Sequence, residues 1–169
     1  MTFDECFDRL LGHEGEYSED PSDRGNWTSG VIGLGLMKGT KWGISAAAYP
    51  DLDIKSLTKA EAKHIYRHDY WSAIRAEELP AWLRWHAFDA AVNSGVSQAV
   101  LWVQRAVGTA VDGKLGPVTV ATAHRADPGT AIARFNGHRL QFMTSSAGWA
   151  TQGKGWARRV ADNLIRSAL

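Results

Sequence analysis

The sequence contains a single cysteine, Cys6, and no apolar run as long as the roughly 18 residues that a membrane-spanning helix needs. One cysteine cannot form an internal disulfide, and it is too few thiolates for an ordinary Cys/His zinc site. The N-terminal segment is rich in acids and lacks the basic start and apolar core of a secretion signal. We therefore expect no transmembrane segment, and accumulation in a reducing cytoplasm.

An excess of charge of one sign is also missing, because 19 Lys and Arg balance 18 Asp and Glu. The two ends of the chain differ, however. Residues 1–30 hold eight acids and two bases, whereas residues 130–169 hold six Lys/Arg and only Asp162. The overall balance argues against a nucleic-acid-binding protein, while the basic end favours contact with an anionic polymer.

With 169 residues, of which 44% are hydrophobic, the chain can bury a core without a disulfide or a metal. Apolar residues at helical spacing predict a helix from residue 2 to about residue 13. Residues 12–43 hold 8 of the 17 glycines, which predicts loops, turns or a short hairpin. Thr58 and Glu61 form a capping-box motif that opens a further helix. Later helices are expected at about 80–94, 97–107, 117–125, 128–145 and 154–168.

Glu14 falls at the expected end of the first helix and opens an acid-rich loop that includes Asp20 and Asp23. The negative end of the helix dipole and partial cover by apolar groups would both raise the pKa of such a carboxyl. A protonated carboxyl beside an ionised one suits general-acid cleavage of a glycosidic bond. The alternative is an exposed helix end in a solvated loop. A calcium-binding loop is less favoured, because the terminal Glu of an EF-hand is missing.

Two segments, HEGEYSEDPSDRGN (residues 13–26) and GTKWGIS (residues 39–45), closely resemble the signature of the family 108 glycoside hydrolases. These are N-acetylmuramidases found among phage and prophage endolysins. The resemblance extends over roughly residues 5–165, and its later part is similar to the predicted peptidoglycan-binding region of that family.

The resemblance implies an α+β, predominantly α-helical protein with a lysozyme-like fold and a small β-hairpin region near the N-terminus, at about residues 16–44. It implies a single domain over residues 1–169. Within that domain we expect a muramidase motif region at about 5–94 and a helical peptidoglycan-binding-like region at about 95–168.

The resemblance places the family's catalytic acid on Glu14. The second carboxylate is expected nine positions later, at Asp23. Asp20 competes for this role, but it precedes Pro21 and can be explained as a turn former. Glu16 stands where the family pattern has a glycine, and its charge would raise the pKa of Glu14 further if the two side chains approach each other.

A second departure from the family pattern is a longer hairpin, residues 26–38, between the two halves of the motif. It leaves Thr28 and Thr40 as candidates for the threonine of the pattern, which would help to hold the attacking water. Thr40, in GTKWGIS, is the better match.

Further residues are candidates for contact with a sugar polymer, because aromatic rings pack on sugar C–H faces and amides bond acetamido groups. Each also has a structural interpretation, since most large aromatics lie in cores and amides often satisfy backbone groups. The candidate substrate-binding residues are Tyr17, Asp20, Trp27, Thr28, Trp42, Asn93 and Gln104. The histidines show no metal-ligand motif, so no metal site is expected.

The implied activity is hydrolysis of the β-1,4 bond between N-acetylmuramic acid and N-acetylglucosamine in bacterial peptidoglycan, without a cofactor. We expect a monomeric endolysin that stays in the host bacterial cytoplasm until a holin permits release, and that then acts on the cell wall in the periplasm. Two alternatives stay open. A lytic transglycosylase uses a single Glu, and the nearby aspartates disfavour it; an inactive peptidoglycan-binding or scaffold module would not need Glu14.

Overall fold

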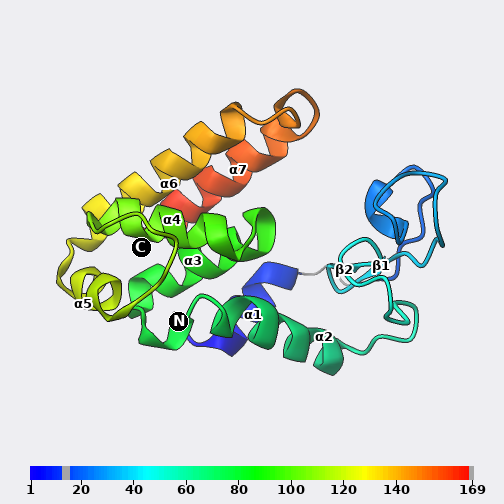
Figure 1. Cartoon of the computed structure of the whole chain (residues 1–169), viewed down its shortest axis with the longest axis horizontal. Coiled ribbons are helices and arrows are strands. Elements are labelled where there is room, and N and C mark those ends of the chain that lie inside the picture. Colours follow the sequence, from blue (N-terminus) through cyan, green and yellow to red (C-terminus); the bar gives the residue numbers. More distant parts are fainter. Residues whose placement is uncertain (13–15, 168–169) are drawn as a thin grey trace. The chain divides into compact units, whose positions relative to one another are not determined.

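The computed structural model describes residues 1–12 and 16–167. The chain divides into two compact units (Figure 1). We call residues 4–67 the hairpin unit, and residues 1–3 together with the chain from His68 onward the helical unit. The predicted regions at about 5–94 and 95–168 are a different division, which stays a prediction.

Helix α1, Phe3–Leu11, ends two residues earlier than the sequence pattern predicts. Gly12 ends it by adopting a left-handed conformation, with φ of +57°, while its N–H donates to the carbonyl of Asp8. The apolar face of the helix is buried, and Phe7 packs against Tyr66 with ring centroids 5.6 Å apart.

A short 3-10 helix, η1 (Arg24–Asn26), precedes an antiparallel hairpin of β1 (Thr40–Lys41) and β2 (Ile44–Ser45). Trp42 and Gly43 form the two-residue turn, with φ of +52° and +73°, as a type I′ hairpin turn requires. A Cβ at Gly43 would lie 2.4 Å from the Tyr66 hydroxyl, so only glycine fits there. The predicted hairpin region is confirmed.

Helix α2, Lys59–Tyr66, begins at the predicted capping box. Thr58 accepts from the backbone N–H of Glu61, and the Glu61 carboxylate accepts from the backbone N–H of Thr58. Lys59 and Lys63 of this helix pair with Asp8 and Asp4 of α1, at 3.3 and 3.1 Å. The chain then continues as a π-helix, η2 (Arg67–Ser72).

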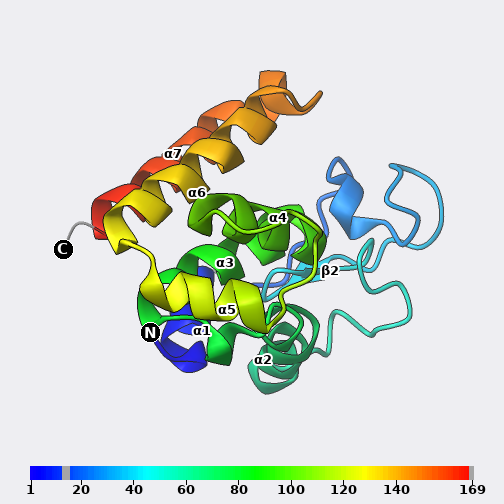
Figure 2. The ribbon, with the colours of Figure 1, turned by 60° about the vertical axis from the view of Figure 1, so that its left-hand side comes forward.

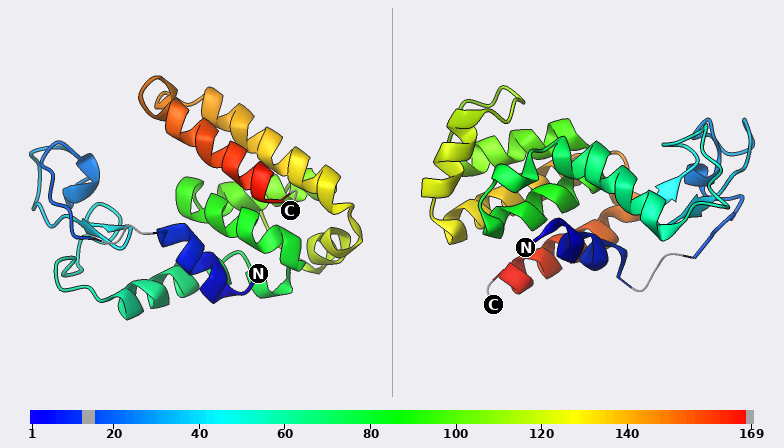
Figure 3. Two further views of the ribbon diagram at one scale, coloured as in Figure 1. Left: turned by 180° about the vertical axis from the view of Figure 1, so that it is seen from behind. Right: turned by 90° about the horizontal axis from the view of Figure 1, so that it is seen from below.

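The helical unit contains a 3-10 helix, η3 (Ala76–Glu78), followed by five α-helices. They are α3 (Ala81–Ser94), α4 (Val96–Val107), α5 (Pro117–Arg125), α6 (Pro128–Thr144) and α7 (Trp149–Ser167). Helix α4 packs against α3, α5 and α6, while α6 and α7 lie side by side (Figures 2 and 3). All five predicted helices are present, and the predicted α+β, mostly helical, lysozyme-like fold is confirmed.

Helix α7 begins five residues before its predicted start at 154. Gly153 lies inside the helix and is buried under the ring of Trp149, where a Cβ would lie 2.6 Å from ring carbons. The glycine is thus required by packing within the helix. Among the described residues, no helix is both long and apolar enough to cross a membrane.

A buried ionic cluster joins α3, α6 and α7. Asp89 is fully buried and accepts hydrogen bonds from Arg139, Arg159 and Asn163. Burial raises the pKa of Asp89, but the charges of Arg139 and Arg159 outweigh it, so the pKa lies below its ordinary value. The side chain of Asn163 also accepts a 2.8 Å bond from the Trp85 indole. The cluster holds the three helices together.

Candidate active site

The expected general acid, Glu14, lies outside the described residues. The structure does describe the motif from Glu16 onward. Its acid-rich turn, its two threonines and its two tryptophans all belong to the hairpin unit.

Asp20 and Asp23 are both exposed, and both stabilise turns. The Asp20 carboxylate accepts from the backbone N–H and the hydroxyl of Ser22, at 2.9 and 2.7 Å, and these bonds lower its pKa. Asp23 caps η1 by accepting from the N–H of Gly25 at 2.8 Å. The bonds of Asp20 agree with its explanation as a turn former, and Asp23 has a turn role as well. The role of Asp23 as second carboxylate stays a prediction.

Asn26 connects the acid-rich turn to the hairpin. It is fully buried, and its side-chain N–H donates to the carbonyl of Asp20 at 3.0 Å. Its side-chain oxygen accepts from the Thr40 hydroxyl at 2.7 Å, and its backbone carbonyl accepts from the N–H groups of Lys38 and Gly39. Asn26 is not among the residues predicted from the sequence. A lone Asn in a glycine-rich loop gives no periodic signal, and only its place inside the family-like motif could have pointed to it.

The two candidate threonines have different roles. The hydroxyl of Thr28 accepts from the N–H of Leu36 at 2.9 Å and so holds the base of the inserted loop. The hydroxyl of Thr40 instead bonds Asn26, and Asn26 in turn holds the acid-rich turn. This geometry favours Thr40 as the threonine of the motif, although its role in catalysis stays a prediction.

Trp27 and Trp42 are both half-buried, and each is fixed by its indole N–H. Trp27 donates to the carbonyl of Pro21 at 3.0 Å, and Trp42 donates to the carbonyl of Leu57 at 3.2 Å. Positive φ is rare for a bulky residue such as Trp42, and the turn of the hairpin imposes it here. Each ring thus has a defined orientation and an accessible part, as a sugar-stacking role requires.

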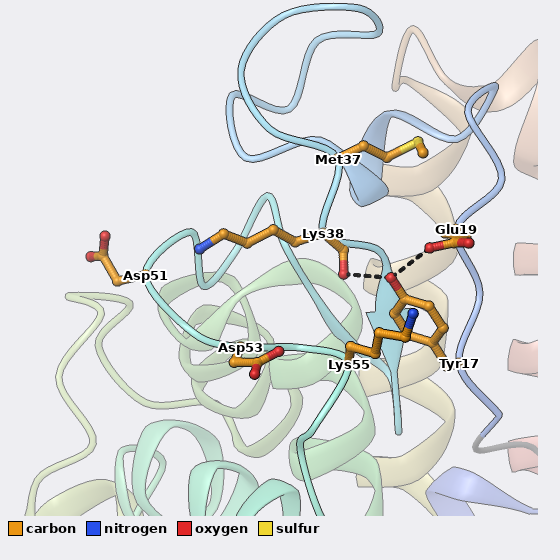
Figure 4. A pocket seen from close by; sticks show the side chains of 7 residues that line it. All are labelled: Tyr17, Glu19, Met37, Lys38, Asp51, Asp53 and Lys55. Atoms are coloured by element: carbon orange, nitrogen blue, oxygen red, sulfur yellow. Dashed lines mark hydrogen bonds between the residues drawn. The ribbon is translucent and has the colours of Figure 1, made fainter.

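A pocket of about 430 Å³ opens in the hairpin unit (Figure 4). It is lined by Tyr17, Glu19, Met37, Lys38, Asp51, Asp53 and Lys55. The ammonium group of Lys38 donates to the carbonyl of Pro50 at 2.6 Å, which ties the segment before the hairpin to the loop that carries the two aspartates. Of the predicted substrate-binding residues, Tyr17 lines this pocket.

The Tyr17 hydroxyl points to one end of the pocket, where it donates to Glu19 at 2.9 Å and contacts the carbonyl of Lys38 at 3.2 Å (Figure 4). Burial, the bond to Glu19 and the charges of Glu19 and Asp53 raise the pKa of Tyr17. Lys55 lies over its ring, 5.7 Å from the centroid. The phenol is therefore a protonated donor near neutral pH, beside carboxylates that can accept from sugar hydroxyls.

Asn93 lies in the helical unit, where it is exposed and its side-chain oxygen accepts from Arg139 at 3.3 Å. It helps to line a second pocket, of about 210 Å³, together with Ser94, Phe142, Met143, Ser146 and Trp156. An amide beside partly exposed aromatic rings suits an acetamido sugar. Contact between Asn93 and substrate stays a prediction.

Gln104 is buried, and its amide is engaged by the loop that follows α4. It donates to Asp112 at 2.6 Å and to the carbonyl of Lys114 at 3.0 Å, and it accepts from the N–H of Gly113 at 2.9 Å. The geometry matches the structural interpretation of this residue, in which its amide satisfies backbone groups. We leave Gln104 out of the proposed site for this reason.

The described part of the chain contains no group of three or more His, Cys, Asp or Glu side chains that could hold a metal ion. The arrangement of Asp20, Asp23 and Tyr17 instead offers hydrogen-bonding and acid–base groups. Such groups are the means by which glycoside hydrolases cleave glycosidic bonds.

The model of the Glycosyl hydrolase 108 family matches residues 7–95, which is more than half of the chain. The chain belongs to this family. The solved structure of Brucella abortus SagA is similar to this family 108 hydrolase, with a TM-score of 0.81 and 29% sequence identity. The similarity covers 98% of this chain and 93% of SagA. No match was found among curated proteins. Family membership supports a peptidoglycan-hydrolysing glycosidase activity in general terms.

Proposed function

We propose that this family 108 hydrolase cleaves the β-1,4 bond between N-acetylmuramic acid and N-acetylglucosamine in peptidoglycan. The observation that carries the proposal is the family match over residues 7–95, a range that contains Glu14. The role of Glu14 rests on the resemblance of its motif to that of the family. Glu14 protonates the oxygen of the leaving sugar. Asp23, ionised, activates a water on the opposite face of the sugar ring, and Thr40 helps to hold that water.

The hydrogen bonds of Asn26 in the hairpin unit support this proposal. Asn26 links Thr40 to the turn that carries Asp20 and Asp23, so the water-holding hydroxyl and the carboxylates keep a fixed relation. Catalytic groups must be held close to their productive geometry to be effective.

The remaining residues of the proposal bind the polymer. Tyr17, Trp27 and Trp42 contact sugars in the hairpin unit, where their rings have fixed orientations. Asn93 contacts an acetamido group in the helical unit, and residues 95–168 act as the peptidoglycan-binding region.

The biological role that we propose is that of a phage or prophage endolysin. The enzyme is monomeric, stays in the host bacterial cytoplasm until a holin permeabilises the inner membrane, and then reaches the wall in the periplasm. This role is supported by the resemblance of the motifs to endolysins. The basic residues of 130–169 add attraction to an anionic wall.

Mass spectrometry of muropeptides released from purified sacculi tests the proposed reaction. Hydrolysis of the proposed bond yields products with a reducing N-acetylmuramic acid end. A lytic transglycosylase would instead yield an anhydro end, lighter by one water, and an inactive binding module would yield no products. Either of these outcomes, or a reducing N-acetylglucosamine end, would contradict the proposal.

A further inference from the structure

Residues 31–37, which we call the apolar loop, carry five large hydrophobic side chains that face solvent. Their exposed fractions run from 41% at Met37 to 65% at Leu36, and the other three are Val31, Ile32 and Leu34. In the described part of the chain, the other exposed large apolar side chains are not gathered in one loop in this way. A contiguous exposed apolar patch of this kind marks an interaction site.

Hydrogen bonds define the conformation of the apolar loop. At its base the N–H of Thr28 donates to the carbonyl of Leu36 at 2.9 Å. Within it the N–H of Leu34 donates to Val31 at 3.1 Å, and the Ser29 hydroxyl donates to Leu34 at 2.7 Å. These bonds satisfy the carbonyls of Val31, Leu34 and Leu36 and the N–H of Leu34, which lowers the cost of moving these groups out of water.

The charged residues nearest to the apolar loop in the sequence are basic. Residues 25–37 contain no charged side chain, and the wider stretch 24–48 contains Arg24, Lys38 and Lys41 but no acid. Glu19, Asp51 and Asp53 line the pocket, and Figure 4 shows the loop extending from Met37 away from that pocket. Insertion of residues 31–37 would therefore bury no charged side chain of the loop, and the cation of Lys38 directly follows the loop in the chain.

We propose that the apolar loop inserts into the boundary between headgroups and acyl chains of an anionic phospholipid bilayer, with the cations of residues 24–48 facing the headgroups. Apolar side chains flanked by Lys or Arg are the combination that binds such interfaces. A second copy of the chain is a poorer occupant, because one loop of seven residues falls well short of the ~800 Å² per partner of a typical stable interface. This membrane contact is independent of the proposed catalytic reaction.

Co-sedimentation with vesicles of phosphatidylglycerol and phosphatidylethanolamine tests the proposal. The wild-type protein should bind. The double variant Leu34→Ser/Leu36→Ser should bind at least about tenfold more weakly, because it lacks two apolar side chains that insertion into the bilayer would bury. Val118→Ser is the matched control, since Val118 is 74% exposed on α5. It should bind as the wild type does. Binding to neutral phosphatidylcholine vesicles should be weaker than binding to the anionic ones.

A second double variant, Val31→Ser/Ile32→Ser, changes a different part of the loop, so a local fold defect in one variant would not explain weaker binding by both. Both variants should keep the melting temperature of the wild type. The proposal is overturned if the wild-type protein stays in the supernatant, or if both loop variants bind as well as it does. It is equally overturned if the loop variants abolish a concentration-dependent dimer instead of vesicle binding. Digestion of sacculi, measured in parallel, separates failure of this proposal from failure of the proposed reaction.

Discussion

The hydroxyl of Thr40 donates a 2.7 Å hydrogen bond to the side-chain oxygen of Asn26, which is fully buried. Asn26 uses its remaining side-chain group to hold the carbonyl of Asp20 at 3.0 Å. One buried amide thus joins the two halves of the family motif, which are separated in the sequence by the inserted loop. The inserted residues can lengthen the hairpin without disturbing the relation between the acid-rich turn and Thr40.

We expect Thr40→Val to lower the lytic rate by at least about tenfold, because the isosteric valine can neither hold water nor bond Asn26 and leaves a buried acceptor unpaired. Thr28→Val is the matched control. It removes only the bond to the N–H of Leu36, so it should keep most of the activity. The measurement is turbidity clearing of permeabilised cells, alongside thermal melting of each variant. If Thr28→Val lowered the lytic rate more than Thr40→Val at equal melting temperature, Thr28 and not Thr40 would be the threonine of the motif.

The two aspartates of the turn provide a matched pair, because each carboxylate accepts hydrogen bonds from a turn. Asp23→Asn and Asp20→Asn should therefore cost similar, small amounts of stability. Their activities should differ, with Asp23→Asn losing most of the lytic rate. If Asp23 activates water, the released sugar has inverted anomeric configuration. Proton NMR of the freshly formed reducing ends, recorded before mutarotation, measures this configuration. Retained configuration, or greater damage from Asp20→Asn, would contradict the role of Asp23.

The buried Asp89 should dominate the acid sensitivity of the helical unit. Asp89→Asn leaves Arg139 buried without its counter-charge, so we expect a loss of about 3–5 kcal/mol in the free energy of unfolding near neutral pH. The folded-state pKa of Asp89 is depressed. Its stabilisation is therefore fully present above the unfolded value of about 3.9 and is lost as pH falls through the folded value.

Urea denaturation of the wild type and of Asp89→Asn at several pH values measures this difference. The gap between the two proteins should begin to shrink below about pH 4, where the carboxyl is protonated in the unfolded state, and should close as the pH falls through the lower pKa of the folded state. Asp162→Asn is a control at an exposed position of α7 and should show no gap. A gap that stays constant with pH would show that packing, not charge, explains the effect of Asp89.

Much of the fold could be predicted from local signals. The capping box at Thr58, the glycine-rich stretch before residue 43 and the helical periodicity after it correspond to features that the structure contains. The predicted bounds of α1 and α7 differ from the observed ones next to a glycine in each case. Gly12 ends α1 through its left-handed conformation, whereas Gly153 lies within α7 because the Trp149 ring covers it. Whether a glycine ends a helix or belongs to its packing depends on neighbours that a local pattern does not include.

The site was less accessible to sequence reasoning. The hub residue Asn26 and the buried Asp89 act through partners that are distant in the sequence, Thr40 in one case and Arg139 in the other. Polar residues of this kind have no periodicity, so only the folded chain shows their pairing. Gln104, by contrast, was singled out by its motif, and the structure shows its amide bonded within the loop after α4.

The central claim is that Glu14 is the general acid, and the Glu14→Gln variant tests it most directly. The amide is nearly isosteric with the acid but cannot donate an acidic proton, and loss of general-acid catalysis typically costs about 10²–10⁴-fold in rate. The rate of muropeptide release from purified sacculi should fall by at least about 10²-fold, while the circular dichroism spectrum stays unchanged. A folded Glu14→Gln variant that releases muropeptides within tenfold of the wild-type rate would contradict the claim.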